Sequence, residues 1–444
     1  MTDTGHAVPL RPGQQGPLTG LVVLDCSMVW AGPYCTKLLG DLGATIIKIE
    51  ANRQLDSVRG PAIPPASSSP LSLYANSDPG ADPWNRNGYF NKYNRNKLGV
   101  CMNILMPGGR AVFMELAAIA DVVVENFGGG VFERMGFGYE VIKGVNEDVV
   151  FVSMPPSGNG GPEGKYVGYG VAIEQLGGIV ARTGYRDDDS PMKTGINYGD
   201  PIAGMHTASY IMTALMHRRK SGRGQYIDLS QREATINWIG ESVLAYQMTG
   251  QDSEWIGNRD AYMAPSGTYR CAGDDSWIAL AVGSDAEWRG LCAAIGRGNL
   301  LSQYATHTLR AEHHDAIDAA IGEWTAPREA DEAMATLQQH GVAAGVCSDN
   351  RRVVHDPHLN ARGFWPEVEH SSAGRHILAG EAWNYSRTPA AIYAAAPTLG
   401  EHTDYVLREI LGKSDEEIGR LRADGVLENI PEEVLQQQNR SGQD

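Results

Sequence analysis

Cysteine is scarce in this chain, and none of it occurs in close pairs. The 444 residues include 6 cysteines, and no two of them form a Cys-x-x-Cys motif. Disulfide-stabilised secreted domains and thiolate zinc sites both require clustered cysteines. The scattered thiols therefore predict a reduced, cytoplasmic protein without a disulfide framework.

Long apolar runs and an excess of positive charge are also missing. No segment approaches the ~18 apolar residues of a membrane-spanning helix. The first 16 residues are rich in Pro and Gly and lack the apolar core of a signal peptide. Asp and Glu total 53 against 37 Lys and Arg, which gives a net charge of −16. Because nucleic-acid-binding proteins usually carry a basic face, we expect no nucleic-acid partner. The missing apolar runs predict no membrane partner, and the polar composition of residues 1–16 predicts a flexible tail.

Short apolar runs separated by helical patterns dominate the first third of the chain. Each run is nearly continuous in apolar residues, as the buried strands of parallel sheets are. These runs occupy residues 21–25, 44–50, 99–103, 121–125 and 148–154. Helical patterns over 33–42 and 108–120 lie between them. Strand–helix–strand repeats of this kind predict an α/β fold with a doubly wound, Rossmann-like parallel sheet.

The character of the sequence changes after this region. The pattern is mostly helical over 170–248, and residues 267–271 and 276–282 then read as a hairpin of two strands. We predict a large α/β domain, a linker with a smaller α+β domain, and a return segment whose C-terminal helices complete the large domain. Their predicted ranges are 17–235, 236–355 and 356–444.

Asp200 begins the most informative helical pattern. Pro201 suits the first position of a helix, where its missing N–H loses no bond, and Asp is a favoured cap just before it. Apolar residues then recur at helical spacing until Gly222, which predicts the end of the helix. On these residues alone, Asp200 is interpreted as a plain helix N-cap.

Two other motifs allow more than one interpretation. Gly128–Gly130 follows a predicted buried strand, where open parallel sheets often bind ligands, but a tight turn without a ligand has the same pattern. His355–His358 (His-Asp-Pro-His) has no third partner at a spacing typical of metal sites, and Asp-Pro favours a turn. We therefore expect no metal site.

Several segments match one known family when they are taken together and in order. They are residues 20–25, 29–33, 39–50, 94–97 (Asn-Arg-Asn-Lys), 124–130, 134–137, 199–200, 221–225 and 399–403. Over about residues 18–427, the chain resembles the class III coenzyme A (CoA) transferases, the CaiB/BaiF family. This family includes formyl-CoA:oxalate and carnitine-type CoA transferases.

The resemblance implies transfer of CoA from an acyl-CoA to a free carboxylic acid. Asp200 stands where the family has its catalytic aspartate, which forms a covalent aspartyl-CoA thioester. Its position at a helix N-terminus is expected to keep the carboxylate ionised and aimed. The resemblance also implies an intertwined homodimer, with CoA and acyl-CoA as substrates and no permanently bound cofactor. Succinyl-CoA is the candidate donor.

Further positions match the family's CoA contacts. They are Val29, Trp30, Ala31, Lys97, Met102, Asn126, Phe127 and Arg134. The resemblance implies that Arg134 faces a phosphate, and Lys97 is a weaker candidate for the same role.

Departures from the family pattern bear on the substrate. Trp30 stands where the formyl-transferring member has a glutamine, which suggests a bulkier or more apolar acyl group. Ala51 replaces an arginine that contacts CoA. Gly170 occupies a position that holds an acid in many relatives, and Glu174 follows one helical turn later. Gly257–Arg259 is the nearest counterpart of the glycine loop that covers the aspartate in the formyl enzyme.

Two alternatives to the transferase remain at this level. The family also contains α-methylacyl-CoA racemases, whose acid lies at the position of Gly170 and is preceded by histidine, where this chain has Tyr169. A non-catalytic subunit of a heteromeric transferase is the second alternative, although such a subunit has no need of Asp200.

Overall fold

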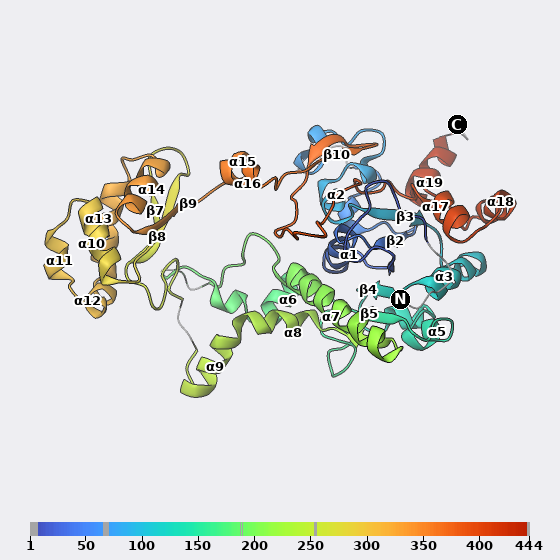
Figure 1. Ribbon diagram of the computed structural model, residues 1–444, viewed down its shortest axis with the longest axis horizontal. Coiled ribbons are helices and arrows are strands. Elements are labelled where there is room, and N and C mark those ends of the chain that lie inside the picture. Colours follow the sequence, from blue (N-terminus) through green and yellow to red (C-terminus); the bar gives the residue numbers. More distant parts are fainter. Residues whose placement is uncertain (1–7, 65–70, 187, 189, 253–254, 442–444) are drawn as a thin grey trace. The chain divides into compact units, whose positions relative to one another are not determined.

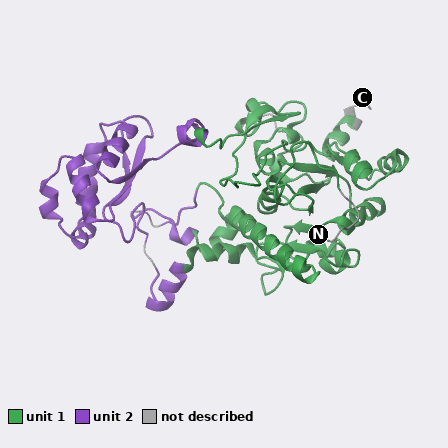
Figure 2. Ribbon diagram, in the orientation of Figure 1, with its two compact units in different colours: residues 1–179, 195–240, 361–444 green, residues 180–194, 241–360 purple. Residues whose placement is uncertain are grey.

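The computed structural model describes residues 8–64, 71–186, 188, 190–252 and 255–441. The chain divides into two compact units (Figure 2). The larger unit contains residues 1–179, 195–240 and 361–444, and the smaller unit contains residues 180–194 and 241–360. The larger unit is thus assembled from three separate segments of the sequence.

A six-stranded parallel sheet forms the centre of the larger unit (Figure 1). Its spatial order is β3-β2-β1-β4-β5-β6. The strands are β1 (Val22–Asp25), β2 (Thr45–Glu50), β3 (Lys97–Cys101), β4 (Val122–Glu125), β5 (Val150–Ser153) and β6 (Gln225–Asp228). This order confirms the predicted doubly wound sheet. It also creates a topological switch point at the carboxyl ends of β1 and β4, where open α/β sheets bind ligands.

Strand β6 was not predicted, because residues 170–248 were expected to be mostly helical. Its side chains alternate between half-buried and exposed, which hides the continuous apolar signal of the other strands. Gly224 directly precedes β6 and packs against the residue before β5. Any side chain at this position would overlap the Val149 carbonyl oxygen. The position of this edge strand therefore depends on close backbone contact with β5, and not on an apolar pattern in its sequence.

The sheet has an apolar core on each face. One core joins the strands to α1 (Ala31–Asp41) and α7 (Gly199–Ser221). The opposite core joins them to α3 (Pro107–Ile119), α4 (Val131–Arg134) and α5 (Tyr139–Lys143). Neighbouring residues of a strand belong to different cores, as Val23 and Leu24 do. Burial on both faces explains why the strands are apolar at nearly every position.

Apart from short 3-10 turns, the remaining elements of the larger unit are also short. They are α2 (Gly88–Tyr93), α6 (Gly170–Leu176), α8 (Gln231–Ile236), the hairpin β10 (Glu367–His370) and β11 (Gly374–Ile377), α17 (Thr403–Tyr405), the π-helical turn Val406–Ile410, α18 (Asp415–Ala423) and α19 (Glu432–Ser441). Helix α9 (Gly240–Thr249) leads into the smaller unit. No helix among the described residues is long and apolar enough to cross a membrane.

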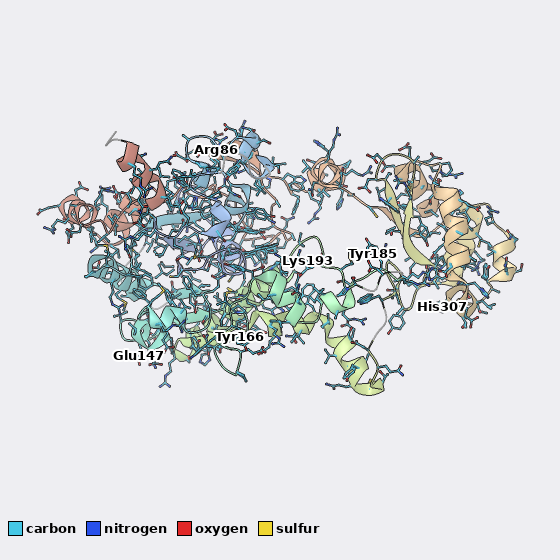
Figure 3. All side chains as sticks on the ribbon, turned by 180° about the vertical axis from the view of Figure 1, so that it is seen from behind. Arg86, Glu147, Tyr166, Tyr185, Lys193 and His307 are labelled. Carbon is cyan, nitrogen blue, oxygen red and sulfur yellow. The ribbon has the colours of Figure 1, made fainter. Side chains whose placement is uncertain are left out.

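The return segment is fastened to the larger unit by buried polar side chains. The Asn96 amide donates to the Ala391 carbonyl at 2.7 Å and accepts from the backbone N–H of Tyr393. Arg86, visible in Figure 3, donates to the carbonyl oxygen of Ser372 beside the β10–β11 hairpin. The Asn-Arg-Asn-Lys signature therefore holds the return segment against the larger unit through hydrogen bonds.

The smaller unit is an α+β body. Its antiparallel sheet has the order β7 (Ser266–Arg270), β8 (Trp277–Ala281) and β9 (Ala343–Val346), and the predicted hairpin is its first pair. Its helices are α10 (Asp285–Ala294), α11 (Asn299–Gln303), α12 (His307–Glu312), α13 (His314–Thr325), α14 (Ala330–Gln339), α15 (Asn350–His355) and α16 (Pro357–Ala361). Residues 180–194 also group with this unit, which the predicted ranges did not include, because the Trp255 indole donates to the Ala181 carbonyl at 2.8 Å.

Two sequence motifs have local structural explanations. The Asp356 carboxylate accepts from the backbone N–H of Leu359 at 2.8 Å, between α15 and α16, so the His-Asp-Pro-His motif is a helix–helix turn. Arg259 pairs with Asp315 and Asp318, which fastens the Gly257–Arg259 segment to α13 within the smaller unit.

The expected flexible tail is wrong from residue 8 onward, and residues 1–7 lie outside the described part of the chain. The buried Gln14 amide donates to the Gly43 carbonyl and to the Thr45 hydroxyl, both at 3.0 Å. Arg11 donates to the Lys97 carbonyl at 3.3 Å. This polar, Pro- and Gly-rich sequence is thus held by hydrogen bonds, and Val8 packs against the core.

Candidate functional site

The loop that follows β1 is clamped at the switch point of the sheet. The Asn126 side chain, just beyond β4, accepts from the Met28 N–H and donates to the Met28 carbonyl, both at 2.8 Å. These two reciprocal bonds join the carboxyl ends of β1 and β4. They hold the backbone of Val29 and Trp30 in a fixed path into helix α1.

Val29 has a strained backbone in this loop. Its φ of +68° lies in the left-handed region, which is a genuine outlier for a β-branched residue. Its N–H donates to the buried Asp56 carboxylate at 2.9 Å, and Lys48 lies 3.7 Å from that carboxylate. Strain of this kind persists only where surrounding contacts over-determine it, and it is typical of functional sites.

Asp200 lies against the N-terminus of α1. Its carboxylate accepts a hydrogen bond from the backbone N–H of Ala31, the first residue of α1, and the residue is 8% exposed. Helices α1 and α7 approach closely at Gly204, where a Cβ would lie 2.7 Å from the Ala31 carbonyl oxygen. The carboxylate of one helix is thereby directed at a free N–H of the other.

The predicted N-cap role of Asp200 is wrong. Helix α7 begins at Gly199 with Tyr198 as its N-cap, so Asp200 is the second residue of the helix. The helix ends at Ser221 with Gly222 in the left-handed conformation, as predicted. The local sequence placed the helix correctly, but the carboxylate bonds to a different helix.

Helix α6 packs closely against the same carboxylate. A Cβ at Gly170 would lie 2.7 Å from the Cβ of Asn197 and 3.1 Å from Cγ of Asp200, and it would overlap the Asp200 Oδ2 atom. Glu174, also on α6, is fully buried, and its Oε1 accepts from the Tyr198 N–H. No residue in the described part of the chain bonds to Glu174 Oε2.

This environment changes the ionisation of Asp200. Burial, and secondly the nearby Glu174 charge, raise the pKa of Asp200 to about 7, while the Ala31 N–H opposes the shift. The helix N-terminus favours the anion, as expected, but burial raises the pKa by more than the Ala31 N–H lowers it. Desolvation outweighs the helix contribution because the group is almost completely enclosed.

Aromatic side chains line the site next to Asp200. The rings of Trp30 and Tyr93 stack with centroids 5.2 Å apart, and Tyr34 meets Tyr93 edge-on at 6.4 Å. Burial raises the pKa of Tyr93, and the charge of Asp200 adds to that shift. The Tyr93 ring thus lies within electrostatic reach of the carboxylate.

A glycine turn extends the site beyond β4. Any side chain at Gly129 would overlap the Gly164 carbonyl oxygen, so the two loops touch through backbone atoms. Asn159 accepts from the Gly130 N–H at 3.1 Å and donates to the Ser153 hydroxyl at 2.8 Å. Arg134 is exposed one turn later, with Nη1 3.4 Å from the Gly129 carbonyl.

Comparison with known proteins now identifies the family. The sequence model of CoA-transferase family III matches residues 18–403, which is most of the chain. The chain belongs to CoA-transferase family III. It is an enzyme of the class that uses CoA thioesters as substrates.

Named relatives agree with this assignment. A succinyl-CoA–D-citramalate CoA-transferase of Chloroflexus aurantiacus is 30% identical over 419 residues, covering 93% of this chain and 98% of the relative. A formyl-CoA:oxalate CoA-transferase of Rhodopseudomonas palustris is 31% identical over 433 residues, covering 93% and 97%. A CaiB/BaiF family protein of Brucella suis, known by its crystal structure, has a TM-score of 0.80 and 28% identity, covering 89% and 100%.

The structure of this family III CoA-transferase brings most of the predicted site residues to one edge of the sheet. They follow β1, follow β4 or begin α7, and they are Val29, Trp30, Ala31, Asn126, Phe127, Arg134 and Asp200. Phe127 stacks on Phe132 at 5.8 Å, which fixes the start of the glycine turn.

Two predicted CoA contacts lie in the core instead. Lys97 is fully buried, and its ammonium donates to Asp25, Pro33 and Asn94, each at 2.9 Å, so its three donors are engaged. Met102 is 1% exposed and packs in the α3-side core. Neither side chain is presented to a phosphate.

Sequence reasoning missed three residues that shape the site. Asp56 supports Val29, Tyr93 stacks on Trp30, and Lys92 lies over both rings. Their positions depend on the fold, although Lys92 and Tyr93 directly precede the Asn-Arg-Asn-Lys signature. Their position next to this signature was the one feature of the sequence that could have pointed to them.

Proposed function

We propose that this family III CoA-transferase moves CoA from an acyl-CoA to a free carboxylic acid through a thioester on Asp200. The observation that carries the proposal is the buried Asp200 carboxylate, which meets the N-terminus of α1 at the switch point of the sheet. Its pKa of about 7 keeps a substantial fraction anionic at neutral pH while making the anion more basic than an exposed aspartate.

The proposed reaction begins with attack of an Asp200 oxygen on the thioester carbonyl. The C–S bond breaks, which gives a mixed anhydride and the CoA thiolate. The thiolate attacks Cγ of Asp200, the anhydride C–O bond breaks, and the donor acid leaves as a carboxylate. An acceptor carboxylate then reverses these two steps and leaves as acyl-CoA. No net proton is consumed, and splitting the exchange this way is covalent catalysis.

We assign CoA binding to the two loops at the switch point. The clamped backbone of Val29, Trp30 and Ala31 forms one side, and Asn126 with Phe127 forms the other. Arg134 is the proposed partner of a CoA phosphate, since its guanidinium is exposed near the glycine turn. Lys97 and Met102 are left out because their side chains are committed to the core.

Succinyl-CoA is our proposed donor. The Chloroflexus relative carries succinyl-CoA in its name, and it aligns with 93% of this chain. The acceptor is a free organic acid. The cytoplasm is the proposed location, in keeping with the scattered thiols, of which Cys347 is exposed and the other five are buried.

We further propose that the chain forms an intertwined homodimer. Helix α9 exposes a run of large apolar side chains, Val243, Leu244, Tyr246 and Met248. On the larger unit, Tyr166 is 59% exposed and is labelled in Figure 3, and Val167 and Tyr169 are exposed beside it. Apolar surface of this extent is typical of a face that a partner covers.

The racemase alternative is disfavoured by the residues at its expected catalytic pair. Gly170 has no side chain, and its Cα faces the Asp200 carboxylate with no room for another group. Tyr169 is exposed and lacks the proton-transfer capacity of a histidine near neutral pH.

The proposed function is tested by trapping the covalent intermediate. Wild-type protein incubated with succinyl-CoA should gain the mass of CoA in a thioester, and hydroxylamine should convert Asp200 to a hydroxamate. The peptide that contains Glu174 is the internal control and should remain unmodified. Exchange of solvent deuterium at the acyl α-carbon, without any adduct or CoA transfer, would instead support a racemase.

The pH profile of adduct formation gives an independent test. Since the anion is the nucleophile and the pKa of Asp200 is about 7, the rate should rise about 10-fold between pH 6 and pH 8 and then level off. Glu174→Gln removes the like charge, so it should shift the profile to lower pH. A flat profile, or a shift to higher pH in the variant, would contradict this assignment.

A further inference from the structure

Lys92 is a cation without an anionic partner at the rim of the site. Its ammonium lies 5.3 Å from the ring centroid of Trp30 and 4.8 Å from that of Tyr93. The two rings stack on each other, and we call this pair the aromatic ledge. Within the described residues, no side chain forms an ion pair with Lys92. Among the described residues, its cation–π contacts are with the two rings of the ledge.

The neighbouring lysine is neutralised, in contrast to Lys92. Lys37 lies 3.2 Å from Glu381 and 3.9 Å from Asp41, and Arg95 shares both carboxylates. The charges around Lys37 therefore balance locally. Partial burial, and secondly the Lys37 charge, lower the pKa of Lys92. Lys92 is exposed, so its ammonium is open to an anion from solvent, and a bound carboxylate would form a charge-assisted hydrogen bond with it.

The ledge is held rigidly. Asn87 caps α2 by accepting from the Tyr89 N–H at 2.9 Å. Phe90 is fully buried beneath the Arg59 guanidinium, 3.4 Å from its ring centroid, and Arg59 is paired with Glu50 at 2.7 Å. Lys92 therefore projects from a fixed helix, and its stem lies on a fixed surface.

The ledge is joined to the surroundings of Asp200 through the backbone at Trp30. Trp30 directly precedes Ala31, whose N–H donates to Asp200, and Tyr93 lies within reach of the Asp200 charge. An acyl chain attached at Asp200 would run along these apolar ring faces. Its far end would then meet the ammonium.

We infer that Lys92 on the aromatic ledge binds a second carboxylate, so that the enzyme selects acyl groups and acids that are dicarboxylic. This inference rests on the proposed function of Asp200 and specifies its substrate class. The rings contact the methylene chain, and the ammonium pairs with the distal carboxylate. In this proposal Trp30 is the floor of an anion site, which is an alternative to the bulkier or more apolar acyl group expected from the sequence.

The test compares two donors that differ at one position. Succinyl-CoA and butyryl-CoA have the same chain, but succinyl-CoA ends in a carboxylate where butyryl-CoA ends in a methyl group. We would measure kcat/KM for formation of the enzyme–CoA adduct with each donor. In Lys92→Met, the value for succinyl-CoA should fall about 10- to 100-fold, as expected for loss of a charge-assisted bond, and that for butyryl-CoA by at most about 3-fold.

Two variants control the comparison. Lys92→Arg keeps the cation and should retain most of the preference for succinyl-CoA. Lys143→Met removes another lysine that lies over an aromatic ring, 5.7 Å from the centroid of Tyr139, and it should change neither donor's value by more than about 2-fold. Thermal melting of each variant checks that the fold is kept.

The possible failures are distinguishable. Equal losses for both donors in Lys92→Met would mean that Lys92 serves CoA or the fold, and would overturn the inference. No loss for either donor would overturn it as well. If the wild-type enzyme forms no adduct with either donor, the proposed function itself fails, whatever the variants do.

Discussion

Asp200→Asn should reduce CoA transfer by at least about 10⁴-fold, to near the limit of detection, while the fold persists. Asparagine has the same shape, and its carbonyl oxygen can still accept from the Ala31 N–H. It lacks the anionic nucleophile, so neither the anhydride nor the thioester can form. CoA transfer from succinyl-CoA to a free acid, followed by chromatography, measures the loss.

The same variant should also change the dependence of stability on pH. The folded-state pKa of Asp200 is about 7, above its usual value of 3.8, so the folded protein binds the extra proton between these values. Stability from this group is present below about pH 4 and is lost as the pH rises through 7. Asp200→Asn removes that loss, so the variant should melt at a higher temperature than wild type at pH 8, and the difference should shrink as the pH falls and vanish below about pH 4.

A matched control separates this effect from a general loss of negative charge. Asp148 is an exposed aspartate before β5, and Asp148→Asn should leave both the transfer rate and the melting curves close to wild type. Wild-type transfer by Asp200→Asn would exclude the covalent mechanism. Equal melting temperatures at pH 8 would mean that Asp200 is less enclosed than described.

Gly170→Ala should lower the transfer rate about 100-fold or more through a single added methyl group. The new Cβ would overlap Asp200 Oδ2 and approach the Cβ of Asn197 to 2.7 Å. The carboxylate must therefore turn away from the Ala31 N–H, and misplacement of a reacting group by about 1 Å can cost about 100-fold. Adduct formation with succinyl-CoA is the measurement, because it isolates the first chemical step.

The backbone conformation of Gly170 is compatible with alanine, so the substitution tests the effect of the added methyl group and not of backbone strain. Its φ is not in the left-handed region, and it is the first residue of helix α6, so alanine meets no backbone strain there. Overpacking costs about 1–3 kcal/mol, so the loss of stability should stay within that range. Gly419→Ala, in α18 with open space around its Cα, is the matched control and should leave the rate unchanged. A wild-type rate in Gly170→Ala would show that Asp200 does not depend on its contact with α6.

Local sequence patterns were sufficient for much of the fold. Five strands were predictable because each is buried on both faces, which makes nearly every position apolar. The end of α7 was predictable because Gly222 adopts the left-handed conformation that glycine favours. Strand β6 was not, since half of its side chains face solvent and its position depends on contact with β5.

The candidate site also has features that the sequence predicted and features that it did not. Motifs in order along the chain identified the family and singled out Asp200, and that depended on sequence alone. The sequence did not indicate that Lys97 is tied to Asp25, nor that Lys92, five residues earlier, has no such partner in the described part of the chain. Lys97 is the last residue of the Asn-Arg-Asn-Lys signature, and Lys92 lies two residues before its first residue.

What the sequence by itself determined is the family, the parallel α/β fold class and Asp200 as the candidate nucleophile, because periodicity, caps and motifs are properties of neighbouring residues. The tertiary structure alone decided the ionisation of Asp200 and the availability of each lysine. Both depend on desolvation and on charges brought together from distant segments, such as Glu174 beside Asp200. Free energies of that kind are set by what surrounds a side chain in space, which its neighbours along the chain do not specify.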